Sequence, residues 1–581
     1  MHIFADNSRF KGITLPPSGL ALAVLLLLYI FIGLIGHDPW KHDDAITIGI
    51  VYDMATHGHW LLPHLAGQSY PDAPLYYWLG TGFVKAFSWL LPLHDAVRLT
   101  SGLCTLLALS LILQAGRELY GKPFAAAAPL ILAGSLGFLF HAHEAQPMLA
   151  ALTAHTAAYW SLLLLPRRPG LATPVFAFSL TAAFLANGLL PTLTLLPAIV
   201  LTLCFSANRR RDAGLLLLGM ATAAILCAGW LWPLYHTAPD AAAAFLANEL
   251  AQLTFDRPMS INLMDYLNML PWYAWPALPL AGWALWTKRR TLTGRMLLLP
   301  LLAFLATLLM LSVLAQARSA SALLLLPPLV LLAVPGVFSL RRGAANAFDW
   351  FSMVTFSLFA AVAWIAWSAL VFGWPERLAR QAVRLEPGFV GHFDGMAFIF
   401  ALILTIAWFW LIVTSPRSPV RGIMHWMSGL TLFWILVAVL WMPWIDYGKS
   451  YRPVSASLAR VLPAVRSAHQ FHCIANANLP PALLASLDYF DGIQTQALES
   501  KNGRRCDLLL LRGQPRDPDF ITAAGWRMIW EGHRPSDRRD HEKLRLYQRG
   551  RRAKPTAALS DIASPETADD HSGGGRILSI P

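Results

Sequence analysis

The sequence predicts a polytopic α-helical membrane protein with a small α/β domain near its C-terminus. Of its 581 residues, 56% are hydrophobic and only 13% are charged, and the mean hydropathy is +0.49. Soluble chains carry about 25% charged residues. Apolar runs long enough to cross a bilayer, about 17–25 residues, recur as far as residue 444. The net charge of +12 arises mostly from basic residues in short loops, so it gives no reason to expect a nucleic-acid partner.

The first apolar run, from Pro16 to Gly36, is too long for a signal peptide and no small-residue cleavage site follows it. We expect a retained helix with Arg9 and Lys11 on its cytoplasmic side. Further spans are expected near residues 97–116, 123–141, 147–166, 171–187, 189–206, 213–236, 267–287, 295–314, 320–339, 350–372, 395–414 and 421–444. Together they predict about thirteen transmembrane helices.

Basic residues gather in alternate connections between these spans. The basic connections hold Arg117/Lys122, Arg167/Arg168, Arg209 to Arg211, Lys288/Arg289/Arg290, Arg341/Arg342 and Arg417/Arg421. The connections between them are poor in Lys and Arg, or are long, which is the positive-inside pattern. It predicts a cytoplasmic N-terminus and an outer C-terminal region. The main outer segments are then residues 37–96, 142–146 and 237–266.

The segment 37–96 is expected to hold two interfacial helices. One runs from Asp44 to Thr56, with apolar residues four apart and Gly58 as its stop. The other starts at Pro74. Its aromatic residues are interpreted as anchors at the membrane interface: Tyr76, Tyr77, Trp78 and Trp89.

The region 445–550 is richer in charge, and its short apolar runs predict a small α/β domain. Strands are expected at Asp507 to Leu511 and Trp526 to Trp530, and helices at Leu458 to Ala468 and Pro481 to Tyr489. The tail, 551–581, is rich in Pro, Ser, Asp and Gly and is expected to be disordered.

Two of the five cysteines, Cys473 and Cys506, lie in the outer domain, whereas the others fall inside spans. In an oxidising compartment this pair is expected to form a disulfide. The alternative is two unrelated free thiols.

The stretch WKHDDAITIGIVYDMATHGHWLLPHLAGQSYPDAPLYYWL resembles the first outer loop of a family of GT-C glycosyltransferases, the dolichyl-phosphate-mannose-protein mannosyltransferases and lipid A aminoarabinose transferases. The matching positions are Asp43-Asp44, Met54, His57 to Trp60, Pro63, Ala66-Gly67, Tyr70 to Pro74 and Tyr76 to Trp78. Weaker likenesses are EAQPMLA at 144–150, LANGLLPTLTLLPA at 185–198 and QARSASALLLLPP at 316–328. The sequence departs from the family pattern at Ile46, Thr47, Ala73 and Gln146, where the family has Arg, Tyr, Lys and an acid.

The resemblance implies a GT-C transmembrane domain over residues 1–444 and a periplasmic domain over 445–550, in the inner membrane of a bacterium. It implies transfer of a sugar from a polyprenyl-phosphate donor to a lipid A or other glycolipid, polysaccharide or protein acceptor on the outer face, as part of building the cell envelope. The residues agree with this, since there is no Gly-rich phosphate loop and no cytoplasmic catalytic domain.

The chemistry needs a carboxylate to take the acceptor proton and a cation to hold the leaving phosphate. One carboxylate acting as base gives inversion, whereas a second, nucleophilic one would give retention. The candidate catalytic acids are Asp43, Asp44 and Glu144, and Arg318 is the candidate phosphate ligand. Further donor-binding or substrate-binding candidates in the matched loop are Asp72, Tyr70 and Tyr76.

Each of these residues also has a structural interpretation. Asp43 or Asp44 could cap the helix, and Asp72 could only shape a turn before Pro74. Glu144 could be a solvated turn acid and Arg318 a residue at the membrane interface.

Whether the protein binds a divalent cation is left open, and the candidate ligands are Asp72 and His64. The spacing of His57, His59 and His64 matches no strong zinc signature, so surface histidines are the favoured interpretation. Two other functions also stay open, a transporter and a non-catalytic scaffold of the same fold. A transporter predicts internal repeats and charges at mid-span, and neither is evident.

Overall fold

The computed structural model describes residues 19–253, 258–291, 295–468, 473–477, 479–513, 525–537 and 542–550. The expected disordered tail, the start of the first span and its flanking Arg9 and Lys11 lie outside these ranges.

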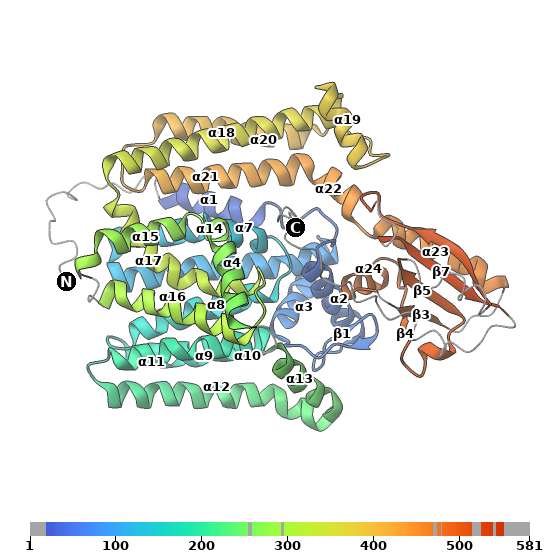
Figure 1. Ribbon diagram of the computed structural model, residues 1–581, viewed down its shortest axis with the longest axis horizontal. Helices are drawn as coiled ribbons and strands as arrows, with labels where there is room; N and C mark the ends of the chain where they lie inside the picture. Colours follow the sequence, from blue (N-terminus) through green and yellow to red (C-terminus); the bar gives the residue numbers. More distant parts are fainter. Residues whose placement is uncertain are drawn as a thin grey trace.

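The long helices of the N-terminal part run side by side in one bundle (Figure 1). In chain order, this part of the bundle comprises α1 (Gly19–Phe31), α4 (Leu93–Tyr120), α5 (Lys122–Ala125), α6 (Ala127–Ala133), α7 (Leu136–Ala142), α8 (Pro147–Leu164), α9 (Pro169–Asn187), α10 (Leu189–Thr194), α11 (Leu196–Cys204) and α12 (Arg209–Thr237). It continues with α14 (Met259–Tyr273), α15 (Ala277–Thr287), η2 (Arg289–Thr291), α16 (Arg295–Leu314), η3 (Ser321–Leu325), α17 (Leu326–Ser339), α18 (Arg342–Phe372), α20 (Gly395–Thr414), α21 (Arg421–Leu436), η4 (Val437–Trp441) and α22 (Met442–Lys449).

Among the described residues, eight helices are long and apolar enough to cross a membrane, or up to nine if one bent pair counts as a single span. That pair, Lys122–Ala133 and Leu136–Ala142, is bent by 67°. Other expected spans are divided into shorter helices near prolines such as Pro197 and Pro276, because proline removes a helical hydrogen bond. The protein is a polytopic membrane protein, whereas the count of thirteen spans stays a prediction.

Burial differs sharply across the bundle. The span that ends in α17 is almost wholly enclosed, and α17 packs against α15, α16 and α6. In contrast, α12, α18 and α20 lie on the outside of the bundle and expose most of their apolar side chains (Figure 1). In a membrane protein such exposed apolar surface faces lipid.

A set of shorter elements covers one end of the bundle (Figure 1). They are α2 (His42–His57), the hairpin of β1 (His64–Leu65) and β2 (Gln68–Ser69), α3 (Leu75–Phe87), α13 (Pro239–Gln252) and α19 (Glu376–Leu385). Helix α2 ends at Gly58, whose φ of 77° suits glycine and whose N–H donates to the Met54 carbonyl. The expected helix stop is therefore confirmed.

The C-terminal elements form a five-stranded sheet flanked by helices. They are α23 (Arg452–Ala468), β3 (Ile474–Ala477), α24 (Pro481–Asp491), β4 (Gln496–Ala497), η5 (Gly503–Arg505), β5 (Leu508–Arg512), β6 (Trp526–Gly532) and β7 (Leu544–Arg549). The strand order is β4-β3-β5-β7-β6, in which β3 is parallel to β4 and β5 and the remaining pairs are antiparallel. Both expected strands and both expected helices are present.

Helix α24 joins this domain to the bundle by packing on α2 (Figure 1). The two helices meet at Gly49, where an added Cβ would lie 2.7 Å from the Ala485 Cβ. Glycine is needed there for close approach. As a result α2 is enclosed on most sides, from Asp44 to Val51, rather than lying half-exposed at an interface.

Candidate functional site

The adjacent acids of α2 have different surroundings. The Asp43 side chain is exposed, and its Oδ2 accepts a hydrogen bond of 2.8 Å from the Gln146 amide. The Asp44 side chain is buried, with only 1% of its surface exposed. Neither caps the helix, because the N-cap position is Lys41 and it makes no side-chain cap bond. The capping interpretation is therefore wrong.

Asp44 is held by a buried guanidinium. Arg98 donates from Nε to Asp44 Oδ1 at 3.0 Å and from Nη2 to Oδ2 at 2.7 Å. Asp44 Oδ1 also accepts from the Ala145 N–H at 2.7 Å. Burial alone would raise the pKa of Asp44, but the charge and hydrogen bonds of Arg98 outweigh it and the pKa falls below its usual value. Asp44 is thus an ionised side chain that connects α2 to α4 and to the turn before α8.

Arg98 is a central residue of this site that no motif in the sequence indicated. Its Nη1 also donates to the His37 carbonyl at 2.8 Å and contacts Asp95 Oδ1 at 3.3 Å. The sequence did offer one indication of its role. An Arg inside the second apolar span is costly unless an acid pairs with it.

Glu144 sits in the turn between α7 and α8. Its Oε2 lies 3.1 Å from Lys41 Nζ, and its Oε1 lies 2.5 Å from His141 Nδ1. Burial would raise the pKa of Glu144, but the Lys41 ammonium and the hydrogen bond of His141 lower it to about 2. Glu144 is therefore a paired, ionised group rather than a solvated turn acid. The pair fixes the turn that carries Gln146 and so orients the amide on Asp43.

Asp72 precedes α3. Its Oδ2 accepts from the Tyr77 hydroxyl at 2.6 Å and its Oδ1 accepts from the Ala73 N–H at 2.8 Å. Burial raises the pKa of Asp72, although both hydrogen bonds oppose the shift.

The hydroxyl of Tyr70 lies within the electrostatic influence of three charged side chains. Burial, together with the carboxylates of Asp72 and Asp43, raises the pKa of Tyr70 to about 12, while the guanidinium of Arg318 opposes this rise. The Arg318 side chain is exposed and makes no hydrogen bond or ion pair within the described part of the chain. The structure therefore brings Asp43, Asp72 and Arg318 within electrostatic reach of one tyrosine.

Two aromatic residues lie elsewhere than expected. Tyr76 and Tyr77 are buried rather than placed as interface anchors. The Tyr76 hydroxyl bonds to Ser101 Oγ at 2.6 Å, which in turn donates to the Glu144 carbonyl. Tyr76 is therefore closed off from a substrate and supports the turn behind the site. Trp89 remains exposed, as an anchor requires.

Glu249 of α13 is a second group that the sequence analysis missed. Its Oε2 accepts from the Leu189 N–H at 2.6 Å. Burial raises the pKa of Glu249 to about 7, and the charge of Asp72 adds to the rise. The Glu249 carboxylate fits here because residue 188 is a glycine. A Cβ added at Gly188 would lie 1.9 Å from Glu249 Oε2. Residues 237–266 carry no motif that could have indicated this acid.

Among the described residues, one group of side chains has the spacing of a metal site, namely Asp53, His59 and His64. Asp72 is not part of this group, so the expected pairing of His64 with Asp72 is wrong. Asp72 is engaged by Tyr77 instead.

In the C-terminal domain a disulfide joins Cys473 to Cys506. It ties the residue before β3 to the residue after η5, at one end of the sheet. The three other cysteines are free.

The fold is the ArnT-like GT-C fold. The structure matches the crystal structure of ArnT from Cupriavidus metallidurans bound to undecaprenyl phosphate with a TM-score of 0.65 and 17% identity, over 92% of this chain and 99% of that chain. The match to the apo state of the same protein has a TM-score of 0.60 and 16% identity, over 92% and 98% of the two chains. At these identities the likeness establishes the fold alone.

A curated protein is similar in sequence. The undecaprenyl phosphate-alpha-4-amino-4-deoxy-L-arabinose arabinosyl transferase 1 of Sodalis glossinidius (strain morsitans) is 28% identical over 309 residues. The match takes in 49% of this chain and 53% of that protein, so the chain spans about half the length of this curated relative. No family model matches the sequence. The resemblance indicated by the first outer loop is confirmed by these comparisons.

Proposed function

We propose that this protein is a glycosyltransferase that moves a sugar from a polyprenyl-phosphate donor to an acceptor hydroxyl at the outer face of the bacterial inner membrane. The observation that carries the proposal is the convergence of an open carboxylate, Asp43, and an unpaired guanidinium, Arg318, on the region around Tyr70. The two charges match the two needs of the reaction. The name of the curated relative and the ArnT-like fold support a donor of the undecaprenyl-phosphate type.

In this mechanism Asp43 is the general base. It accepts the proton of the acceptor hydroxyl as the oxygen bonds to the anomeric carbon, while the bond from that carbon to the phosphate oxygen breaks. Attack opposite the leaving group inverts the configuration. Arg318 forms charge-assisted hydrogen bonds to the departing polyprenyl phosphate.

The other acids have positioning roles. Asp44 and its Arg98 partner fix the start of α2, and Glu144 with Lys41 fixes the turn that carries Gln146. Asp72 holds the loop beside Tyr70 through Tyr77.

The acceptor is proposed to be lipid A or another glycolipid, a polysaccharide or a protein on the periplasmic side. The alternation of basic connections supports a cytoplasmic N-terminus and a periplasmic C-terminal domain. Met528 on β6 is half exposed and suits a test. A Met528→Cys chain should react with an impermeant thiol reagent in intact spheroplasts, above the signal of the parent chain. Reaction only after lysis would reverse the topology.

The decisive experiment compares Asp43→Asn with wild type by mass spectrometry of outer-face glycolipids in cells and by donor turnover in nanodiscs. Loss of a general base costs about 10²–10⁴-fold in rate, and the isosteric change should leave folding intact. Asp240→Asn is the matched control, because Asp240 is an exposed acid on α13 at the same end of the bundle. Wild-type transfer by Asp43→Asn would remove this residue from the chemistry. An absence of any glycan change when the whole protein is deleted would favour the scaffold instead.

A further inference from the structure

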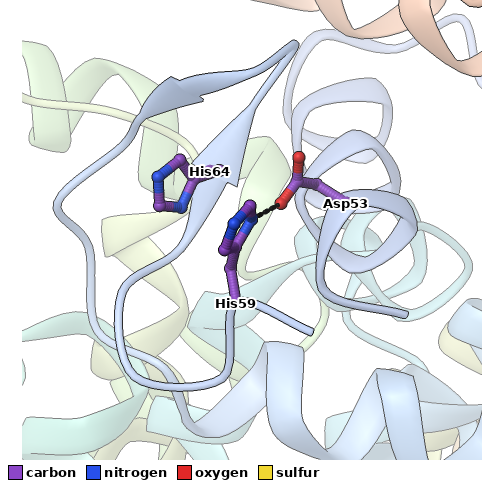
Figure 2. Close-up of side chains that lie close together, drawn as sticks. All are labelled: Asp53, His59 and His64. Atoms are coloured by element: carbon purple, nitrogen blue, oxygen red, sulfur yellow. Dashed lines mark hydrogen bonds and ion pairs between the residues drawn. The ribbon is translucent and has the colours of Figure 1, made fainter. Parts of the chain in front are cut away.

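Three side chains converge beyond the proposed catalytic groups, where α2 ends and the hairpin begins. They are Asp53 in the last turn of α2, His59 just after it and His64 at the start of β1 (Figure 2). Each offers one ligand atom, and these atoms all lie within 4.8 Å of one another.

The carboxylate of this cluster is unusual. Asp53 is 1% exposed, yet within the described residues no Lys or Arg forms an ion pair with it. Its partners are His59 Nδ1 at 2.5 Å and His57 Nδ1 at 3.4 Å. The charge of Asp53 also helps to raise the pKa of a second carboxyl group, Asp488 of α24, so two acids lie near each other here. A buried carboxylate beside another acid calls for a compensating positive charge.

The histidines are arranged as ligands. His64 Nδ1 lies 2.9 Å from the Leu62 carbonyl, so this nitrogen donates and leaves the Nε2 lone pair free. Histidines that bind metals commonly use the second ring nitrogen in this way. The rings of His59 and His64 are stacked with centroids 4.0 Å apart, which disfavours a positive charge on both rings at once. A cation shared between them removes that conflict.

We propose that Asp53, His59 and His64 bind one divalent transition-metal ion of the zinc class. Two imidazoles and one carboxylate form a donor set that suits Zn²⁺, with the fourth position left to water or to His57. Bonds of about 2.0–2.2 Å place the ligand atoms of one ion roughly 3–4 Å apart, which small side-chain rotations achieve from the present arrangement. The ion supplies the positive charge that Asp53 lacks.

The site lies where the bundle meets the C-terminal domain. The hairpin that carries His64 contacts α24, and the Gln68 amide donates to the Thr495 carbonyl at 3.1 Å. The same loop continues to Tyr70 and Asp72. A bound ion therefore ties the end of α2 to the loop that leads to α3, next to the C-terminal domain. This inference does not depend on the proposed sugar transfer.

The test uses full-length protein purified with a tag that contains no histidine, stripped with chelator and then loaded with ZnCl₂. We expect about one zinc per chain by elemental analysis after desalting, and a higher melting temperature with zinc. His64→Ala and His59→Ala should lower zinc affinity by at least tenfold in competition with a chelating dye, with loss of the thermal shift. His236→Ala is the matched control, because His236 is an exposed histidine at the end of α12.

Asp53→Asn removes the buried charge and should weaken zinc binding as well. Because this change can also affect folding, the two histidine variants decide the question. Zinc content below a tenth of an ion per chain in wild type would overturn the proposal. Equal zinc binding by wild type and both histidine variants would overturn it too, since the metal would then sit elsewhere on the surface.

Discussion

Asp44→Asn is expected to destabilise the protein, in contrast to Asp43→Asn, which is expected to remove activity alone. The substitution keeps the shape of the side chain but removes the charge that faces Arg98. The guanidinium is fully buried, and among the described residues Asp95, at 3.3 Å, is its remaining ion-pair partner. In either orientation the new amide would point its N–H₂ group at a donor of Arg98, and in one of them also at the Ala145 N–H.

The expected loss of stability in Asp44→Asn follows from these contacts. Removing one partner of a buried ion pair costs about 3–5 kcal/mol, and Asp95 keeps the loss near the lower figure, about 3 kcal/mol. An unfolding entropy of about 2.1 cal/mol/K per residue gives roughly 1.2 kcal/mol/K for 581 residues. The expected fall in melting temperature is therefore at least about 2–3 °C, and larger if only part of the chain unfolds.

The assay is thermal unfolding in detergent at a fixed scan rate, with donor turnover measured below the transition. Asp240→Asn again serves as the control, and Arg98→Gln combined with Asp44→Asn tests the pair. The double variant should be more stable than the sum of the single losses predicts, because it removes both charges of the Asp44–Arg98 pair rather than leaving one of them unpaired. An Asp44→Asn protein with the melting temperature of wild type and no turnover would refute this reasoning and make Asp44 the base.

Three further predictions concern charge and cross-links. Glu144 has a pKa of about 2, below its ordinary 4.5, so its ion pair stabilises the fold above pH 4.5 and this stabilisation is lost as pH falls toward 2. The difference in melting temperature between wild type and Glu144→Gln should therefore narrow from pH 4.5 toward pH 2. Arg318→Ala should raise the donor KM about tenfold or more, with incomplete recovery in Arg318→Lys and no change in the exposed control Arg380→Ala. Cys473→Ser with Cys506→Ser should cost about 3 kcal/mol in the C-terminal domain, and titration of denatured, unreduced wild type should give three thiols rather than five.

Structural features that depend on residues close together in the chain could be predicted from the sequence. Apolar runs indicated the membrane bundle, Gly58 indicated the end of α2, and the short runs near Leu508 and Trp526 indicated strands. Each of these depends on the local period or on a single backbone conformation. The residue motif of the first outer loop indicated the fold family for the same reason.

Contacts between distant segments could not be predicted in this way. Arg98 follows Asp44 by 54 residues, and the interaction of Tyr70 with Arg318 spans far more. The expectation that Tyr76 lies at the interface failed because α3 turns that side chain inward, toward Ser101 on α4. For an aromatic residue at the start of an amphipathic helix, the neighbouring sequence does not show whether the ring lies at the membrane interface or is buried.

The acids at this end of the bundle differ in the partners that they contact, and this difference bears on which of them is proposed as the base. Asp44 faces a guanidinium and Glu144 an ammonium, so their negative charges are already committed to ion pairs. Asp72 accepts hydrogen bonds on both of its oxygens. Asp43 is exposed and, among the described residues, its hydrogen-bond partner is a neutral amide, that of Gln146. A base needs an open lone pair and a charge that no fixed cation neutralises, so these contacts support the proposal that Asp43, rather than Asp44, Glu144 or Asp72, takes the proton of the acceptor hydroxyl.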